Sequence, residues 1–124
     1  MRTVLALLAA LVASPALAEG DADKGRIVYR KCMVCHSLNE GANRQGPSLH
    51  NIVGRPVAAV DGYTYSDALV AAGEEGRVWD DELLRDYLYN PRQAFPGTRM
   101  IFAGLRKDQD LADIIAYLKA EGEK

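Results

Sequence analysis

The sequence predicts an all-α domain in which long loops separate short helices. Glycine and proline interrupt the chain between the candidate helices, most densely over residues 41–64. No run of alternating apolar and polar residues indicates a strand. The clearest helical pattern lies near the C-terminus, where four apolar residues share one face: Leu111, Ile114, Ile115 and Leu118.

The first two predicted helices each follow a capping residue. Asp21 or Asp23 can cap a helix that runs to about Cys32, since a short polar side chain accepts hydrogen bonds from the first free backbone N–H groups. After the long loop, Ser66 can cap a short helix that stops near Gly73.

The second half of the chain predicts two more helices. Asp80 can cap one of them, and Pro91 ends it because proline cannot continue a helix. Residues 91–107 return to loop, and Asp108 can cap the C-terminal helix. Two loops of this length are uncommon in a compact domain unless they bind something, so they indicate a large ligand.

Residues 1–18 have the features of a cleaved signal peptide. A short positive start precedes an apolar run over residues 4–12, which is too short to span a bilayer. Small residues at 16–18 then match a signal peptidase site. We expect cleavage after Ala18, which leaves residues 19–124 as one exported, soluble domain. The alternative is a retained membrane anchor.

The charge of the chain excludes one broad class of partner. Its formal net charge is −2 at neutral pH, and nothing in that balance attracts nucleic acid. The basic and acidic residues are unevenly distributed along the chain, however, and this asymmetry could orient the protein when it docks with a partner protein.

The cysteines and the histidine beside them form the most informative motif, Cys32-Met33-Val34-Cys35-His36. A disulfide between Cys32 and Cys35 would close a very short loop and constrain little of the unfolded chain. Two thiols at this spacing can instead form thioether bonds to the vinyl groups of haem, with His36 as an axial ligand of the iron. A redox dithiol would need a βαβ context, and a zinc site would need a fourth ligand.

The second axial ligand has few candidates beyond the signal peptide. Met33 lies between the two cysteines and cannot reach the opposite face of a haem. His50 is the one spare imidazole, and we expect it to face solvent in a loop. Met100 lies in a loop rich in proline and glycine, where a core-filling methionine is unusual. The sequence therefore favours Met100.

The mature chain resembles the class I c-type cytochromes, especially the mitochondrial-like bacterial branch. The resemblance covers nearly the whole domain and rests on segments that occur in the family's order. These are Gly25 with Tyr29, CMVCH at 32–36, GPSLHNIVGR at 46–55, DGYTYSDA at 61–68, Trp79, YLYNP at 87–91, PGTRMIFAG at 96–104 and DIIAYLK at 113–119.

The resemblance implies a fold of about four to five helices, with long loops wrapped around one covalently bound haem c. It implies that Cys32 and Cys35 anchor the haem, and that Gly25 and Tyr29 meet the last helix near Ile114 and Tyr117. It assigns the axial positions to His36 and Met100. It also implies that the Pro47 carbonyl accepts a hydrogen bond from the His36 ring and so fixes its orientation. The remaining implied contacts are Arg55, Tyr65, Trp79 and Thr98 at the haem propionates, and Tyr87 and Phe102 in the haem pocket.

Such a site predicts an electron carrier rather than an enzyme, because two protein ligands leave no open position on the iron. We expect a periplasmic monomer. The resemblance implies a donor such as a quinol–cytochrome c oxidoreductase, and a terminal oxidase, photosynthetic reaction centre or peroxidase as acceptor. Two alternatives are a ligand-binding enzyme that loses Met100 and a dedicated subunit of one dehydrogenase.

Overall fold

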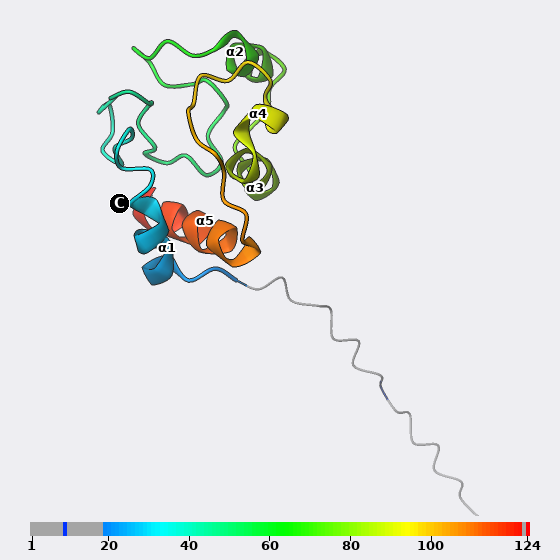
Figure 1. Ribbon diagram of the computed structural model, residues 1–124. Coiled ribbons are helices and arrows are strands. Elements are labelled where there is room, and N and C mark those ends of the chain that lie inside the picture. Colours follow the sequence, from blue (N-terminus) through cyan, green and yellow to red (C-terminus); the bar gives the residue numbers. More distant parts are fainter. Residues whose placement is uncertain (1–8, 10–18, 123) are drawn as a thin grey trace, which may run out of the picture.

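The computed structural model describes residues 9, 19–122 and 124, and it confirms the all-α fold. Within these residues an isolated antiparallel bridge between Pro56 and Val78 is the one strand-like pairing. The predicted signal peptide lies outside the described residues, apart from Ala9. The helices are α1 (Ala22–Tyr29), α2 (Asp67–Glu74), α3 (Asp81–Tyr89), α4 (Pro91–Ala94) and α5 (Asp108–Gly122) (Figure 1).

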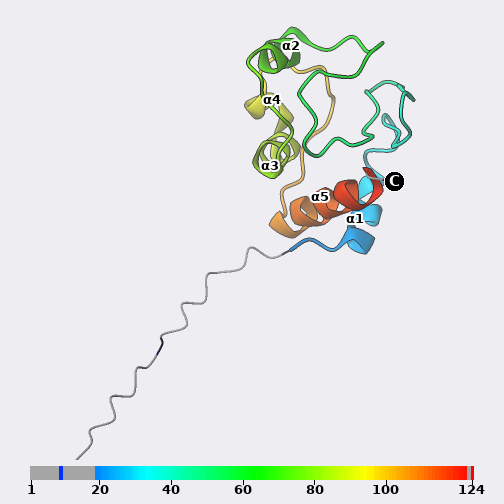
Figure 2. The same ribbon diagram turned by 180° about the vertical axis from the view of Figure 1, so that it is seen from behind.

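The first and last helices cross in close contact. Figures 1 and 2 show α1 lying against α5 from opposite sides. Gly25 permits this approach, because a Cβ built on it would lie 2.6 Å from the Cβ of Tyr117. Next to this point the rings of Tyr29 and Tyr117 pack with their centroids 5.3 Å apart. The crossing that the sequence implied is therefore present.

Asp113 of α5 also holds the start of α1. It is only 3% exposed, and its Oδ1 accepts hydrogen bonds from the backbone N–H of Asp21 at 2.8 Å and from Nε2 of Gln109 at 2.8 Å. The Asp21 side chain in turn accepts from the N–H groups of Asp23 and Lys24, so Asp21 is the cap of α1. A single buried carboxylate thus joins the two ends of the domain.

The predicted caps of the two middle helices are confirmed. Oγ of Ser66 accepts from the N–H of Leu69 at 3.3 Å, and Oδ1 of Asp80 accepts from the N–H of Leu83 at 2.8 Å. The third cap is different, since Asp108 is the first residue of α5 rather than the residue before it. A carboxylate within the first helical turn is still favourable, because it faces the positive end of the helix dipole.

The prediction of loop throughout residues 91–107 was wrong at its start, where α4 forms. Pro91 ends α3 and also opens α4, because the first position of a helix needs no N–H donor. Asn90 caps this short helix by accepting from the N–H of Gln93 at 3.3 Å. The chain therefore bends at Asn90 and continues as a single further turn.

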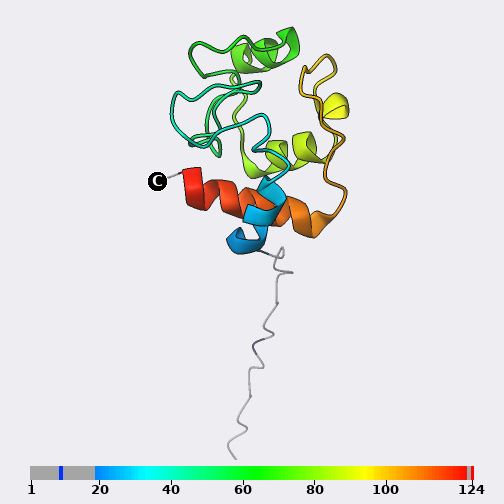
Figure 3. The ribbon, with the colours of Figure 1, turned by 60° about the vertical axis from the view of Figure 1, so that its left-hand side comes forward.

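An aromatic cluster connects α3, α4 and the chain before them. Trp79, Tyr87 and Phe95 are each 6% exposed, and their ring centroids lie 5.1 to 6.0 Å apart. Figure 3 shows the α1–α5 pair at the base of the molecule, with the long loops and α2 on one side of it. In the described part of the chain, no helix combines the length and apolar character needed to cross a membrane.

Candidate haem site

The Cys-Met-Val-Cys-His motif forms a tight turn directly after α1. The backbone N–H groups of Cys35 and His36 both donate to the carbonyl of Cys32, at 3.1 and 3.0 Å. Both cysteines are free and partly buried, whereas Met33 and Val34 between them are 50% and 69% exposed. The turn therefore packs the Cys32 side chain against the core and leaves Met33 and Val34 exposed, while the Cys35 thiol donates to Oε1 of Gln45 at 3.1 Å.

The Cys32 thiol lies in an apolar environment. Burial raises its pKa to about 11, and the charge of Lys31 only partly opposes this effect. The thiol is therefore protonated at neutral pH. This property does not suit a redox thiol, whose reactivity depends on a lowered pKa.

The His36 ring is fixed in one orientation. Its Nδ1 lies 2.8 Å from the carbonyl oxygen of Pro47, and because that oxygen can only accept, Nδ1 carries the proton. Gly46 packs against the ring so closely that a Cβ there would lie 2.6 Å from Nδ1 and 2.8 Å from Nε2. The lone pair of Nε2 remains available to a metal ion.

Burial also keeps this imidazole neutral. It lowers the pKa of His36, the hydrogen bond to Pro47 opposes the shift, and the positive charge of Arg55 adds to it. A neutral ring is the form that coordinates iron, so the chemistry of the site fits a haem ligand.

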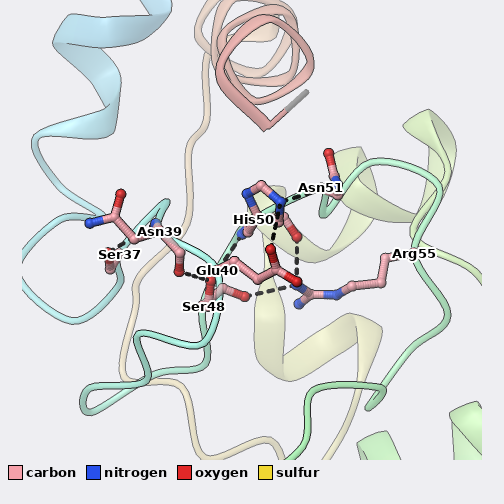
Figure 4. A network of polar contacts seen from close by, with 7 residues as sticks. All are labelled: Ser37, Asn39, Glu40, Ser48, His50, Asn51 and Arg55. Atoms are coloured by element: carbon pink, nitrogen blue, oxygen red, sulfur yellow. Dashed lines mark hydrogen bonds and ion pairs between the residues drawn. The ribbon is translucent and has the colours of Figure 1, made fainter. Parts of the chain in front are cut away.

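Arg55 is held by backbone carbonyls and has an unused donor. Its Nη1 donates to the carbonyl oxygens of Ser48 and His50, both at 2.9 Å, as Figure 4 shows. Its Nε is buried and has no hydrogen-bond partner among the described residues. A buried guanidinium N–H without an acceptor lowers the stability of the fold, and a negatively charged acceptor removes that cost most effectively. A haem propionate has the required charge.

Tyr65 offers a further donor near Arg55, and Trp79 lies next to Arg55 in the fold. The Tyr65 hydroxyl accepts from the N–H of Val60 at 3.1 Å, so its own proton is free to be donated to another group. Burial raises the pKa of Tyr65, which keeps that proton in place, and Arg55 is close enough to act against this shift. Trp79 is joined to Arg55 through the backbone, since its N–H donates to the Arg55 carbonyl at 2.9 Å.

The Met100 loop meets α3 through a short hydroxyl contact. The Tyr87 hydroxyl and Oγ1 of Thr98 lie 2.6 Å apart, and the N–H of Met100 donates to the same Oγ1 at 3.5 Å. Met100 and Phe102 are both partly buried against the core, whereas Ile101 between them is 92% exposed. Thr98 is thus engaged with Tyr87, a contact that the sequence did not predict.

His50 lies in a loop, as predicted, but it is less exposed than we expected. We expected a solvent-facing residue, but its side chain is 21% exposed and lies in a polar network, with Nε2 3.9 Å from Oε2 of Glu40 (Figure 4). The described residues contain no group of three or more His, Cys, Asp or Glu side chains placed to hold a metal ion. Cys32, Cys35 and His36 are not gathered in that way.

Comparison with known proteins identifies the family. The family model described as cytochrome c matches residues 22–121, which is most of the chain. The chain belongs to the cytochrome c family. A cytochrome c2 of Afifella marina is 50% identical over 96 residues, which cover 77% of each chain. A cytochrome c2 of Blastochloris viridis is 44% identical over 124 residues, covering 97% of this chain and 94% of its own.

A solved structure supports the same assignment. Cytochrome cH from Methylobacterium extorquens superposes with a TM-score of 0.73 at 39% identity, covering 82% of this chain and 99% of its own. The fold is therefore that of a class I cytochrome c. As a member of this family, the chain attaches haem c covalently through its cysteines and carries electrons rather than catalysing a reaction.

Three contributors to the site were missed from the sequence. Gly46 packs on the His36 ring, Asn43 joins two loops, and Ser48 is 1% exposed with its hydroxyl donating to the Asn39 carbonyl at 2.6 Å. The only available signal was the position of Gly46 directly before Pro47. The partners of Asn43 and Ser48 are backbone groups, which leave no pattern in a sequence.

Proposed function

We propose that this chain is a soluble periplasmic one-electron carrier whose haem iron is held by His36 and Met100. The observation that carries the proposal is the orientation of His36, because Pro47 and Gly46 fix the ring with Nε2 unused. Cys32 and Cys35 would form the two thioether bonds. Haem c supplies the change between ferric and ferrous iron that stores the electron.

The proposed ligands favour a positive reduction potential. A thioether is a soft, neutral ligand that stabilises ferrous iron, so Met100 would raise the potential relative to a second histidine. Burial acts in the same direction, since a low-dielectric pocket disfavours the extra positive charge of the oxidised state. With both axial positions filled in both states, little rearrangement accompanies each transfer.

The remaining side chains would fix the haem and control its surroundings. Arg55 would donate through its orphaned Nε to a propionate, with Tyr65, Trp79 and Thr98 as further candidates around the two propionates. Tyr87 and Phe102 would line the pocket on the side of Met100. These roles together predict that a propionate is neutralised within the protein rather than exposed to solvent.

Charge would guide docking to redox partners. Exposed basic residues occur in or near the haem-bearing segments, and exposed acidic residues occur in and between α2 and α3. The basic set is Lys31, Arg44, Arg92, Arg99, Arg106 and Lys107, and the acidic set is Glu74, Glu75, Asp80, Asp81, Glu82 and Asp86. We propose that a basic rim at the haem edge orients the carrier towards acidic sites on a donor quinol–cytochrome c oxidoreductase and on an acceptor.

The docking hypothesis has a direct test. The association rate with a terminal oxidase should fall steeply as ionic strength rises, because salt screens exposed charges. A rate that does not change with salt would refute electrostatic steering while leaving the haem ligands unaffected. Export would follow from cleavage after Ala18, which N-terminal sequencing of the periplasmic protein tests.

The ligand assignment can be tested with a matched pair of variants. Met100→Ala should open the sixth position, so the reduced protein should bind carbon monoxide and its potential should fall. Met33→Ala removes the same side chain from a site that is 50% exposed, and it should leave both properties unchanged. Carbon monoxide binding by neither variant, or by both equally, would contradict the assignment of Met100.

A further inference from the structure

A short segment, residues 61–65, is hydrogen-bonded to the loop that holds His36. The carbonyl of Asp61 accepts from Nδ2 of Asn43 at 3.2 Å, and the Tyr63 hydroxyl donates to the carbonyl of Gln45 at 3.0 Å. Gln45 directly precedes Gly46 and Pro47, the residues that contact the His36 ring. This segment, which we term the strap, is therefore tied to one side of the site.

The strap is also joined to the loop of Met100 on the other side. Nη1 of Arg99, the residue before Met100, donates to the carbonyl of Thr64 at 3.4 Å. Just beyond the strap, Ala68 at the start of α2 lies against the same loop, because a Cβ built on Gly97 would be 3.9 Å from its Cβ. In the part of the chain that the structure describes, no hydrogen bond joins residues 43–47 directly to residues 96–104.

The strap is itself stiffened by its two tyrosines. The rings of Tyr63 and Tyr65 pack edge to face with centroids 4.9 Å apart, and the Tyr65 hydroxyl is anchored by the N–H of Val60. Because these contacts stiffen the strap, a displacement of Tyr63 would also displace the neighbouring residues of the strap. One set of attachments is to the loop that contacts the His36 ring, and the other is to the loop that carries Met100.

We propose that the strap ties the loop that contacts the His36 ring to the loop that carries Met100, and that Tyr63 and Arg99 are positioning residues which keep Met100 on the iron. This inference rests on the proposed His36 and Met100 ligation. Its consequence is a long-range effect, in which loss of the Tyr63 hydroxyl on the His36 side loosens Met100 on the opposite side. A tyrosine with only a local role would have no such effect.

The test is the affinity of the oxidised holoprotein for imidazole, which must displace Met100 to bind. The apparent affinity is proportional to the population in which Met100 has left the iron. Tyr63→Phe keeps the ring and its packing on Tyr65, and it removes one hydrogen bond. We expect the affinity to rise about 2- to 10-fold, the range that corresponds to one net hydrogen bond.

Two further variants make the result specific. Arg99→Gln loosens the other attachment and should also raise the imidazole affinity, with an effect in the double variant smaller than the product of the two single effects. Tyr117→Phe removes a hydroxyl from the α1–α5 contact outside the strap, and it should leave the affinity unchanged. Amide hydrogen exchange over residues 96–104 should become faster in Tyr63→Phe.

The outcomes separate this inference from the proposed function. Unchanged imidazole affinity in Tyr63→Phe, or an equal rise in Tyr117→Phe, would overturn the strap even if overall stability fell. Failure of the proposed function would instead appear in the unmodified protein, as an iron that already lacks Met100 before any substitution.

Discussion

Replacement of Gly46 by alanine tests the central geometry of the His36 side. Gly46 has no left-handed backbone conformation, so an alanine there carries no conformational strain and acts only through its methyl group. That methyl would lie 2.6 Å from Nδ1 of His36, whereas ordinary van der Waals contact begins at 3.4 Å. The ring atom Cε1 lies closer still, so the ring and the Gly46 backbone must separate by more than about 0.8 Å, which disturbs the contact between Nδ1 and the Pro47 carbonyl.

The expected loss of stability can be assembled from three contributions. Overpacking of a filled site costs about 1–3 kcal/mol, and loss of the His36–Pro47 hydrogen bond costs about 1 kcal/mol. The lower entropy of the unfolded alanine chain offsets about 0.4–1 kcal/mol. The net destabilisation should be about 2 kcal/mol, and the absorption spectrum should report a disturbed axial ligand.

The assay is denaturant unfolding of the oxidised holoprotein together with its visible spectrum. Gly41→Ala provides the comparison, because Gly41 has a φ of +73° and no heavy atom within 4 Å of a built Cβ. It should cost about 1–2 kcal/mol through backbone strain, and it should leave the spectrum unchanged. A Gly46→Ala protein with the stability and spectrum of the parent would refute the close contact with His36.

Three other predictions follow from the buried polar groups. Asp113→Ala should lower the free energy of unfolding by about 1–3 kcal/mol, because the Asp21 N–H loses its acceptor, and Asp113→Asn should cost less in the same urea titration. Burial raises the pKa of the Tyr29 hydroxyl from 10.0 to about 12, so the stability contributed by its neutral form is complete below pH 10 and is lost as the pH rises to 12. Tyr29→Phe should therefore show a weaker loss of stability between pH 10 and 12, and an unchanged slope would contradict the burial. Arg55→Met should lower the reduction potential by about 40 mV in a redox titration, because it removes about 1 kcal/mol of repulsion between the guanidinium and the extra positive charge of the oxidised haem. Arg55→Lys keeps the positive charge and should lower the potential less.

Much of the fold could be predicted because its determinants are local. Ser66 and Asp80 cap helices through hydrogen bonds to residues three positions away, and such spacing is visible in a sequence. The helix α4 was missed because Pro91 was taken only as an end, although the same residue suits the first position of a new turn. The predicted start of α5 was one residue too late, because an Asp such as Asp108 is favourable both as the cap and in the first turn of a helix.

The candidate site divides in the same way. The residues of the Cys32–His36 motif lie together in the chain, so their chemistry could be predicted from spacing alone. The contacts of Asn43, Tyr63 and Arg99 are made to backbone carbonyls up to 35 residues away, and such acceptors are the same at every position of the chain. The engagement of Thr98 with Tyr87 was missed for a similar reason, since either hydroxyl could have bonded elsewhere.

The most direct test of the account is the absorption spectrum of the mature protein when oxidised, reduced, and reduced under carbon monoxide. The account predicts a low-spin c-type spectrum that carbon monoxide leaves unchanged, because His36 and Met100 occupy both axial positions. A spectral shift on addition of carbon monoxide would mean that the sixth position is open or labile. In that case the electron-carrier site with Met100 as ligand would be contradicted, and a ligand-binding haem would take its place.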